Sequence, residues 1–329
     1  MILNVSQSSS VIFFILFLMP LILAHKSYFY GRGHYAFLNR SNVEALKGAS
    51  MVLILIQSAV HQLPRADLFL RAIASLGDIA LAVFLFYSGY EVVRLGLKSR
   101  QKIRRMMIKK MMGLLLVLLS GNLLFGVVLI YLGEHIHLSQ ILIATLKFHL
   151  IDGTGVLLLA PLFYFYFIIL MSCDLKFLLV ASLSFSGFCY LIGWSPMVIF
   201  YLLGGAILAT YPRYVFLILK RQLLNLTLVL GILIMVFFIL KSSYLMPWIG
   251  IIGTLIMLMK VQFKSPVFAL MDRLAIPLYT VYLPILYFVF YSSEPRHSFW
   301  ILFSLGISLI VALGLKSLKV IFYNRLQMW

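Results

Sequence analysis

Long apolar runs separated by short polar segments repeat along the whole chain. Each run is about the length of a transmembrane helix, which needs roughly 17–25 residues, although several are at the short end. Backbone polar groups have no water to bind inside lipid, and the runs lack the alternation of barrel strands, so we expect helices. The predicted spans are 10–25, 47–63, 73–93, 111–132, 155–172, 177–192, 197–212, 222–240, 246–261, 273–291 and 298–315. The pattern therefore predicts an all-α polytopic membrane protein, a bundle of about eleven transmembrane helices.

Composition supports the same class of protein. Hydrophobic residues make up 63% of the 329 residues and charged residues 11%, against about 45–50% and about 25% in soluble domains. No polar segment is long enough for a second domain. Cys173 and Cys189 give no disulfide framework, and the pair His135 and His137 has no third ligand nearby, so we expect no metal site.

Basic residues gather in alternate gaps between the runs. One set of gaps, with the span ends beside it, carries about 22 of the 27 Lys and Arg residues, and eight of them lie between Arg94 and Lys110. This is the positive-inside pattern, and it predicts an outside N-terminus and a cytoplasmic C-terminus. It also accounts for the net charge of +18, so we expect anionic membrane lipid, not nucleic acid, as the partner of these cations.

Ionisable residues inside a span are costly and are candidates for function. Lys47 and His61 bracket the predicted second span, and Asp78 lies early in the third. Fourteen residues of helix correspond to about 21 Å, so Lys47 and His61 mark opposite ends of one helix. Other ionisable residues at or near span ends are Glu91, His149, Asp152, Asp272 and Arg273.

Two interpretations are open for each candidate. His61 is either a general base facing the bundle interior, since imidazole suits proton removal from a hydroxyl near neutral pH, or a residue of the outer interface. Asp78 either orients a histidine or pairs with a cation, or it too lies at the outer interface. Lys47, apart from any resemblance, fits a cation that snorkels toward the cytoplasmic interface.

Three stretches carry a family resemblance. The first, Glu44-Ala-Leu-Lys47-Gly48, precedes an apolar run, the second leads from Leu76-Gly77-Asp78 to an aromatic run ending in Ser88-Gly89-Tyr90, and the third is Leu274 to Leu283. Together they resemble the membrane-bound acyltransferase family 3 over about residues 42–325. The resemblance implies two parts: an N-terminal helix and cytoplasmic linker at 1–41, and an acyltransferase-3-like domain of ten helices at 42–329.

The resemblance also implies an activity. Members of the family transfer an acyl group, usually acetyl, from cytoplasmic acyl-CoA to a hydroxyl of a cell-surface or exported glycan or glycolipid, without a metal, and the short members usually reside in the bacterial inner membrane. It places a catalytic Arg at Lys47 and a catalytic His at Ser58. Either His61 replaces that base in a shifted register, with Asp78 beside it, or the base has been lost.

The same resemblance, with charge, predicts where acetyl-CoA or another acyl-CoA binds. The thioester is expected beside Ser88 and Tyr90, where Gly89 either admits the pantetheine arm or packs against another helix. The phosphates are expected on Lys98, Arg100, Arg104 and Arg105. The competing class is a catalytically inactive relative or a glycan or lipid transporter on the same scaffold.

Overall fold

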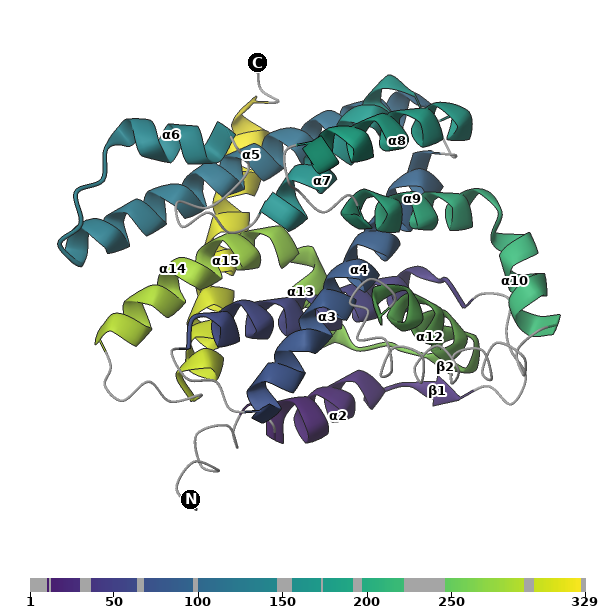
Figure 1. The fold of residues 1–329 in the computed structure, drawn as a ribbon, viewed down its shortest axis with the longest axis horizontal. Helices are drawn as coiled ribbons and strands as arrows, with labels where there is room; N and C mark the ends of the chain where they lie inside the picture. Colours follow the sequence, from purple (N-terminus) through teal and green to yellow (C-terminus); the bar gives the residue numbers. More distant parts are fainter. Residues whose placement is uncertain are drawn as a thin grey trace.

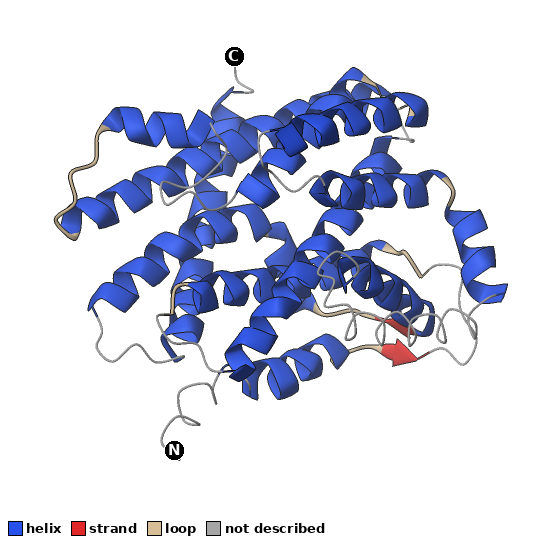
Figure 2. Ribbon diagram, in the orientation of Figure 1, coloured by secondary structure: helices blue, strands red, loops and turns tan. Residues whose placement is uncertain are grey.

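The fold was described from a computed structural model of the chain. It describes residues 11, 13–29, 37–63, 68–96, 100–146, 156–172, 174–191, 197–221, 246–292 and 299–326. Over these residues the regular secondary structure is helical apart from one pair of short strands (Figures 1 and 2). The prediction of an all-α protein is therefore confirmed at the level of class.

The elements follow one another along the chain in a single order. They are η1 (Phe14–Leu18), α2 (Met19–Ala24), β1 (Tyr28–Phe29), α3 (Arg40–His61), α4 (Leu68–Gly96), α5 (Arg100–Tyr131), α6 (Leu138–Leu146), α7 (Val156–Met171), α8 (Leu175–Leu191), α9 (Met197–Thr210), α10 (Pro212–Arg221), α12 (Met246–Lys260), β2 (Val261–Gln262), α13 (Pro266–Arg273), α14 (Ala275–Ser292) and α15 (Phe299–Leu326).

Several helices are suited to a membrane by length and composition. Four are long and apolar enough to cross it, and two bent pairs, α9 with α10 and α13 with α14, raise the number to six if each pair is one span. Shorter apolar helices occur at four further places in the described chain. A membrane-spanning protein is thus supported, whereas the full number of eleven stays a prediction. The expected span 222–240 lies outside the described residues.

Helix α3 begins earlier than the apolar pattern predicts. Its first residue is Arg40, and the side chain of Asn39 caps it by accepting a hydrogen bond from Asn42 N at 2.8 Å. This is the preferred way to satisfy an orphan N–H at a helix start. As a result, Lys47 lies about two turns inside the helix rather than at its end.

The centre of the bundle is formed by α3 and α4, which cross near the middle of Figure 1. Small residues let backbones approach closely there. A Cβ added to Gly48 of α3 would overlap the carbonyl oxygen of Phe268 in α13. On the other side, a Cβ on Gly89 of α4 would overlap the carbonyl oxygen of Leu202 in α9. These approaches seat α13 against α3 and α9 against α4.

A buried amide ties two distant segments to the start of α3. Asn42 is fully buried, its Nδ2 donates to Phe37 O at 2.7 Å, and its Oδ1 accepts from Phe263 N at 2.7 Å. Next to it, Ser41 Oγ donates to Phe263 O at 2.8 Å. The segment around Phe263 continues from the antiparallel pair β1 and β2. Asn42 therefore fixes where α13, and with it Asp272, meets α3.

Candidate functional site

A buried lysine between two carboxylates forms the centre of the site. Lys47 Nζ lies 2.7 Å from Glu91 Oε2 of α4 and 2.9 Å from Asp272 Oδ1 of α13. The side chains of Lys47 and Asp272 are only 9% and 8% exposed. The ammonium thus contacts both carboxylates at ion-pair distance. Lys47 does not snorkel to the interface, so that interpretation is wrong.

A second ion-pair group adjoins the first. Glu44, one turn before Lys47 in α3, pairs with Arg40 and, at 3.3 Å, with Arg273 Nη2. Glu44 is nearly buried, whereas the side chain of Arg40 is 82% exposed. Residues three and four apart share a helix face, so α3 presents Arg40, Glu44 and Lys47 toward the same side.

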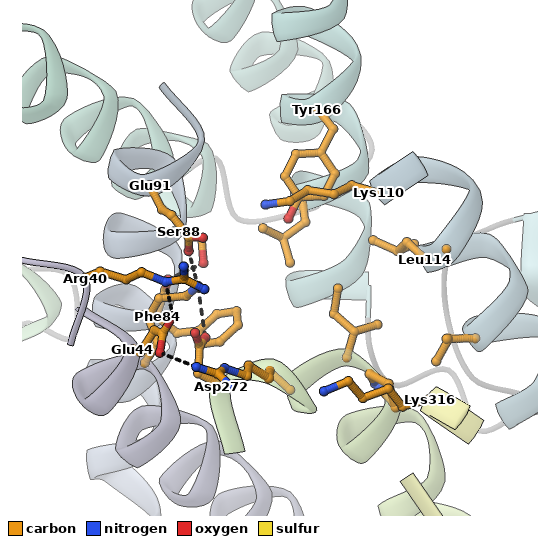
Figure 3. A pocket seen from close by; sticks show the side chains of 18 residues that line it. Arg40, Glu44, Phe84, Ser88, Glu91, Lys110, Leu114, Tyr166, Asp272 and Lys316 are labelled. Carbon is orange, nitrogen blue, oxygen red and sulfur yellow. Dashed lines mark hydrogen bonds and ion pairs between the residues drawn. The ribbon is translucent and has the colours of Figure 1, made fainter. Parts of the chain in front are cut away.

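These side chains line a cavity of about 390 Å³. Figure 3 shows that its polar groups come from different elements and converge. Helices α5, α7, α14 and α15 close the remaining walls. The lining residues are Arg40, Glu44, Lys47, Phe84, Ser88, Glu91, Lys110, Gly113, Leu114, Val117, Leu162, Tyr166, Asp272, Arg273, Ala275, Ile276, Pro277 and Lys316. The cavity thus combines a charged part with an apolar part.

A second cavity of about 330 Å³ lies beside it and shares Arg40, Glu44 and Glu91. Tyr90 and Arg94 also line it. Arg94 Nη1 donates to Leu38 O at 2.7 Å and to Tyr90 Oη at 3.2 Å. Arg40 of α3 thus lines both cavities, whereas Arg94 of α4 lines only the smaller one.

The Ser-Gly-Tyr block divides between the two cavities. Ser88 lines the larger one, and its Oγ donates to Phe84 O at 2.7 Å. Tyr90 lines the smaller one, and Gly89 faces the backbone of Leu202. This close approach supports the helix-packing interpretation of Gly89, and its expected contact with the pantetheine arm stays a prediction. Ser88 and Lys47, which the sequence placed together, do share a cavity.

His61 and Asp78 lie at the other end of α3 and α4. His61 is exposed in the last turn of α3 rather than turned into the bundle, and it lines neither cavity. Asp78 is exposed and accepts a hydrogen bond from Gln57 Nε2 at 2.7 Å. Among the described residues no ion pair joins the two. Both fit the interfacial interpretation, and neither is brought to Lys47.

Of the expected phosphate-binding residues, the structure describes the side chains of Arg104 and Arg105, and neither lines the cavity. Arg104 and Arg105 are exposed on α5 and are absent from the lining, whereas Lys110 of the same helix takes part in it. Lys98 lies outside the described residues, and so does the side chain of Arg100. His149 and Asp152 likewise fall outside them. Lys110 is thus the described cation of this basic run that reaches the cavity, and the binding of phosphate by the run stays a prediction.

Sequence reasoning gave no role to three residues of the site. Glu91 and Asp272 were noted only as ionisable residues at span ends, and the apolar pattern gave no signal for pairing either with Lys47. Lys316 stood in the predicted cytoplasmic tail, but α15 continues to Leu326 and carries Lys316 along the cavity wall. The signal available in the sequence was the rarity of acids, nine in the whole chain, of which three meet here.

Comparisons with known proteins identify no relative, so the site is interpreted from its own chemistry. No family model and no curated protein matches the sequence, and no solved structure matches the fold. Within the described part of the chain, His, Cys, Asp and Glu form no group of three able to hold a metal ion. What the site offers is a buried ammonium, a set of cations and an adjoining apolar surface.

Proposed function

We propose that this protein is an integral membrane O-acyltransferase. It moves an acyl group, most simply acetyl, from a cytoplasmic acyl-CoA to a hydroxyl of a cell-surface or exported glycan or glycolipid. The observation that carries the proposal is that Lys47 and Ser88 line one cavity, although 41 positions separate them in the chain. These are residues from the two N-terminal stretches that resemble the acyltransferase family 3.

The cavity suits the donor on chemical grounds. Acyl-CoA joins phosphates to a pantetheine arm and a thioester, so its site needs cations next to an apolar channel. The lining supplies Arg40, Lys110 and Arg273 as cations, and Leu114 and Leu162 among its apolar groups. In this proposal the chain is a ten-helix family core preceded by one helix. Its cavity faces the cytoplasm of a bacterial inner membrane, and its N-terminus lies outside.

The transfer follows from these placements. The acceptor hydroxyl attacks the thioester carbonyl, a C–O bond forms, the C–S bond breaks, and the hydroxyl proton finally resides on the CoA thiol. Negative charge develops on the carbonyl oxygen in the transition state, and a fixed cation in a poorly solvated site stabilises it. Lys47 is assigned this role because Glu91 and Asp272 hold its ammonium in place.

The proton acceptor is a separate question. His61 lies about 21 Å along α3 from Lys47, beyond direct reach of a thioester held in the cavity. Glu91 lines both cavities and its side chain is 36% exposed, so it is the more accessible of the two carboxylates on Lys47. We assign proton removal to Glu91 and give His61 no part in the step at the cavity.

One observation favours the competing class, an inactive relative or a transporter of glycan or lipid. Among the described residues that line the two cavities, none is a histidine. The family pattern places a histidine in the catalytic centre, so its absence from the lining fits a scaffold that binds an anionic amphiphile without turning it over.

The test is a transfer assay on the purified full chain in detergent with radiolabelled acetyl-CoA and a glycan acceptor. We expect turnover in the wild type, a loss of 100-fold or more for Glu91→Gln, and little change for His61→Ala. A large loss for His61→Ala with full activity in Glu91→Gln would reverse the assignment of the base. No turnover with any acyl-CoA or acceptor would favour the competing class.

A further inference from the structure

Helix α10 turns sharply away from the helix that precedes it. Pro212 is its first residue. A proline has no N–H and its ring clashes with the preceding turn of a helix, so α9 ends at Thr210. The axes of α9 and α10 meet at 96°, and Figure 1 shows α10 at the edge of the molecule, across the end of α9. The two helices therefore cannot both run along the membrane normal.

Helix α9 is the member of the pair that lies beside a candidate membrane span. A Cβ added to Gly205 would overlap the carbonyl oxygen of Phe86 in α4. The close approach of Gly89 to Leu202, one turn away, joins the same two helices. Residues Ser75–Leu95 of α4 are long and apolar enough to cross a membrane. Because two contacts hold α9 against this span, the bend of 96° directs α10 along the membrane surface.

One face of α10 packs against the rest of the protein. Phe216 is only 7% exposed, and the centroid of its ring lies 5.8 Å from that of Phe37. Phe37 is itself held in place, because its carbonyl oxygen accepts the hydrogen bond from Asn42 Nδ2. The contact with Phe37 fixes the rotation of α10 about its own axis, and this rotation determines what the other faces of α10 meet.

A second face of α10 is apolar and exposed. Leu217 and Ile218 are each 60% exposed, and Tyr214 is 69% exposed. Residues three and four apart share a helix face, so these side chains form one surface. Tyr211, at the bend, continues it, and its ring centroid lies 6.3 Å from that of Tyr214. Tyrosine is enriched where hydrocarbon meets lipid headgroups, so this surface suits the boundary of a bilayer.

The charge of α10 is of one sign. Its sequence contains Arg213, Lys220 and Arg221 and no acidic residue. Arg213 and Lys220 are both exposed, and they share a face because seven residues make about two turns. At about 100° per residue, this face lies roughly 110–150° around the helix from Tyr214 and Ile218. Cations on one face and aromatic or aliphatic side chains on another are typical of helices that lie in a membrane surface.

We propose that α10 is an interfacial helix, whose apolar face enters the acyl region and whose basic residues bind the headgroups of anionic phospholipid. Basic residues are attracted to a negatively charged membrane surface, and α10 brings no acid that would oppose this attraction. A second copy of the chain is a poorer partner on grounds of charge, since the chain has 27 basic residues and nine acidic ones. Lipid binding at α10 does not depend on acyl transfer.

The depth of α10 is measured by electron paramagnetic resonance on the purified full chain in vesicles of phosphatidylcholine and phosphatidylglycerol. A nitroxide is attached to one cysteine at position 214, 218 or 220, with Cys173 and Cys189 replaced by alanine. We expect Tyr214→Cys and Ile218→Cys to lie at equal depth, about 5–10 Å into the boundary between headgroups and acyl chains, and to be accessible to oxygen. Lys220→Cys should be shallower and accessible to a water-soluble nickel chelate.

The depth pattern separates an interfacial helix from part of a span. In an interfacial helix the depth depends on the face, whereas in a helix along the membrane normal it changes by about 1.5 Å per residue. Tyr214→Cys and Ile218→Cys would then differ by about 6 Å, and Lys220→Cys would continue the trend. Such a trend overturns the proposal. Protection of both apolar positions from oxygen and from the chelate also overturns it, because a second copy or another protein then covers the face.

The preference for anionic lipid is measured by fluorescence quenching at Ile218→Cys labelled with bimane. Two sets of vesicles contain equal fractions of brominated lipid, either phosphatidylglycerol or phosphatidylcholine. We expect quenching to be a few-fold stronger with brominated phosphatidylglycerol. This preference should disappear in Lys220→Gln with Arg221→Gln, which removes two charges, and should persist in Lys220→Arg with Arg221→Lys, which keeps them.

A matched control uses a residue that faces away from the bundle on another helix. Val127 is 64% exposed in the apolar part of α5, so bimane on Val127→Cys should be quenched equally by the two brominated lipids. Equal quenching at Ile218→Cys, the same preference at Val127→Cys, or loss of the preference in the charge-conserving variant would each overturn headgroup binding by α10.

Discussion

Lys47 Nζ lies 2.7 Å from Glu91 Oε2, across the interface between α3 and α4. The same ammonium lies 2.9 Å from Asp272 Oδ1 of α13. The ammonium of Lys47 thus joins helices α3, α4 and α13. In the sequence, 225 positions separate Lys47 from Asp272. Because both carboxylates depend on it, Lys47 supports the architecture of the site as well as its proposed chemistry.

Removing the charge of Lys47 should destabilise the bundle. In Lys47→Met the chain length is kept, but Asp272 is left as a buried carboxylate without its cation. Breaking a buried pair in this way costs about 3–5 kcal/mol. We expect a loss of this size in the free energy of unfolding, measured in detergent by tryptophan fluorescence. Arg40→Ala, at an exposed side chain, should cost less than about 1 kcal/mol.

A second variant checks the cause of that loss. Asp272 is the more buried of the two carboxylates that Lys47→Met leaves without their cation. Adding Asp272→Asn to Lys47→Met removes that buried charge, so the double variant should recover part of the lost stability. A double variant less stable than Lys47→Met would show that the loss arises from packing rather than charge.

Close helix contacts at two glycines give a prediction with built-in controls. Gly48→Ala and Gly89→Ala each place a methyl group onto a backbone carbonyl of a neighbouring helix, so both should lose about 1–3 kcal/mol of stability. Gly253 and Gly306 are also helical, but nothing lies within 4 Å of an added Cβ. Alanine there should be neutral or stabilise by up to about 1 kcal/mol. Thermal unfolding of the four variants in one detergent provides the comparison.

The apolar pattern predicted where helices occur better than where they end. The run at 246–261 matches α12, Met246–Lys260, and the charged Lys260 stands at its C-terminal end. The run at 298–315 predicted a helix end at residue 315, whereas α15 ends at Leu326. The prediction stopped too early because a helix can continue through polar residues once it leaves the apolar layer. The run at 273–291 begins at a bend of 79° between α13 and α14, which hydrophobicity does not record.

The site was less accessible to sequence reasoning than the fold. Lys47 and Ser88 were selected by resemblance, and the structure brings them to one cavity. The partners Glu91 and Asp272 follow from the packing of α3 against α4 and α13, which no local pattern encodes. His61 was preferred because imidazole suits general base chemistry, yet helix geometry alone already separated it from Lys47 by about 21 Å.

The buried amide of Asn42 offers a further test of how the site is positioned. Asn42→Ala leaves Phe37 O and Phe263 N without the partners they have at 2.7 Å, and each unsatisfied buried group costs about 1–3 kcal/mol. We expect a loss of about 2 kcal/mol or more. Ser41→Ala removes one hydrogen bond from a partly buried side chain and should cost about 0.5–1.5 kcal/mol. Equal stabilities for these two variants would contradict the role assigned to Asn42.

Orientation in the membrane is tested with cysteines at the two ends of α5. Its apolar span, Ile103–Tyr131, has 29 residues and is therefore about 43 Å long, enough to cross a hydrocarbon core of about 30 Å. Arg104 and Glu134 are both exposed near opposite ends of this span. Basic residues favour the cytoplasmic side. Each cysteine is introduced into a background in which Cys173 and Cys189 are replaced by alanine. A membrane-impermeant maleimide is then added to intact spheroplasts. We expect it to label Glu134→Cys in intact spheroplasts, and Arg104→Cys only after the membrane is permeabilised. Labelling of Arg104→Cys in intact spheroplasts would place the cavity on the outer side and exclude a cytoplasmic donor.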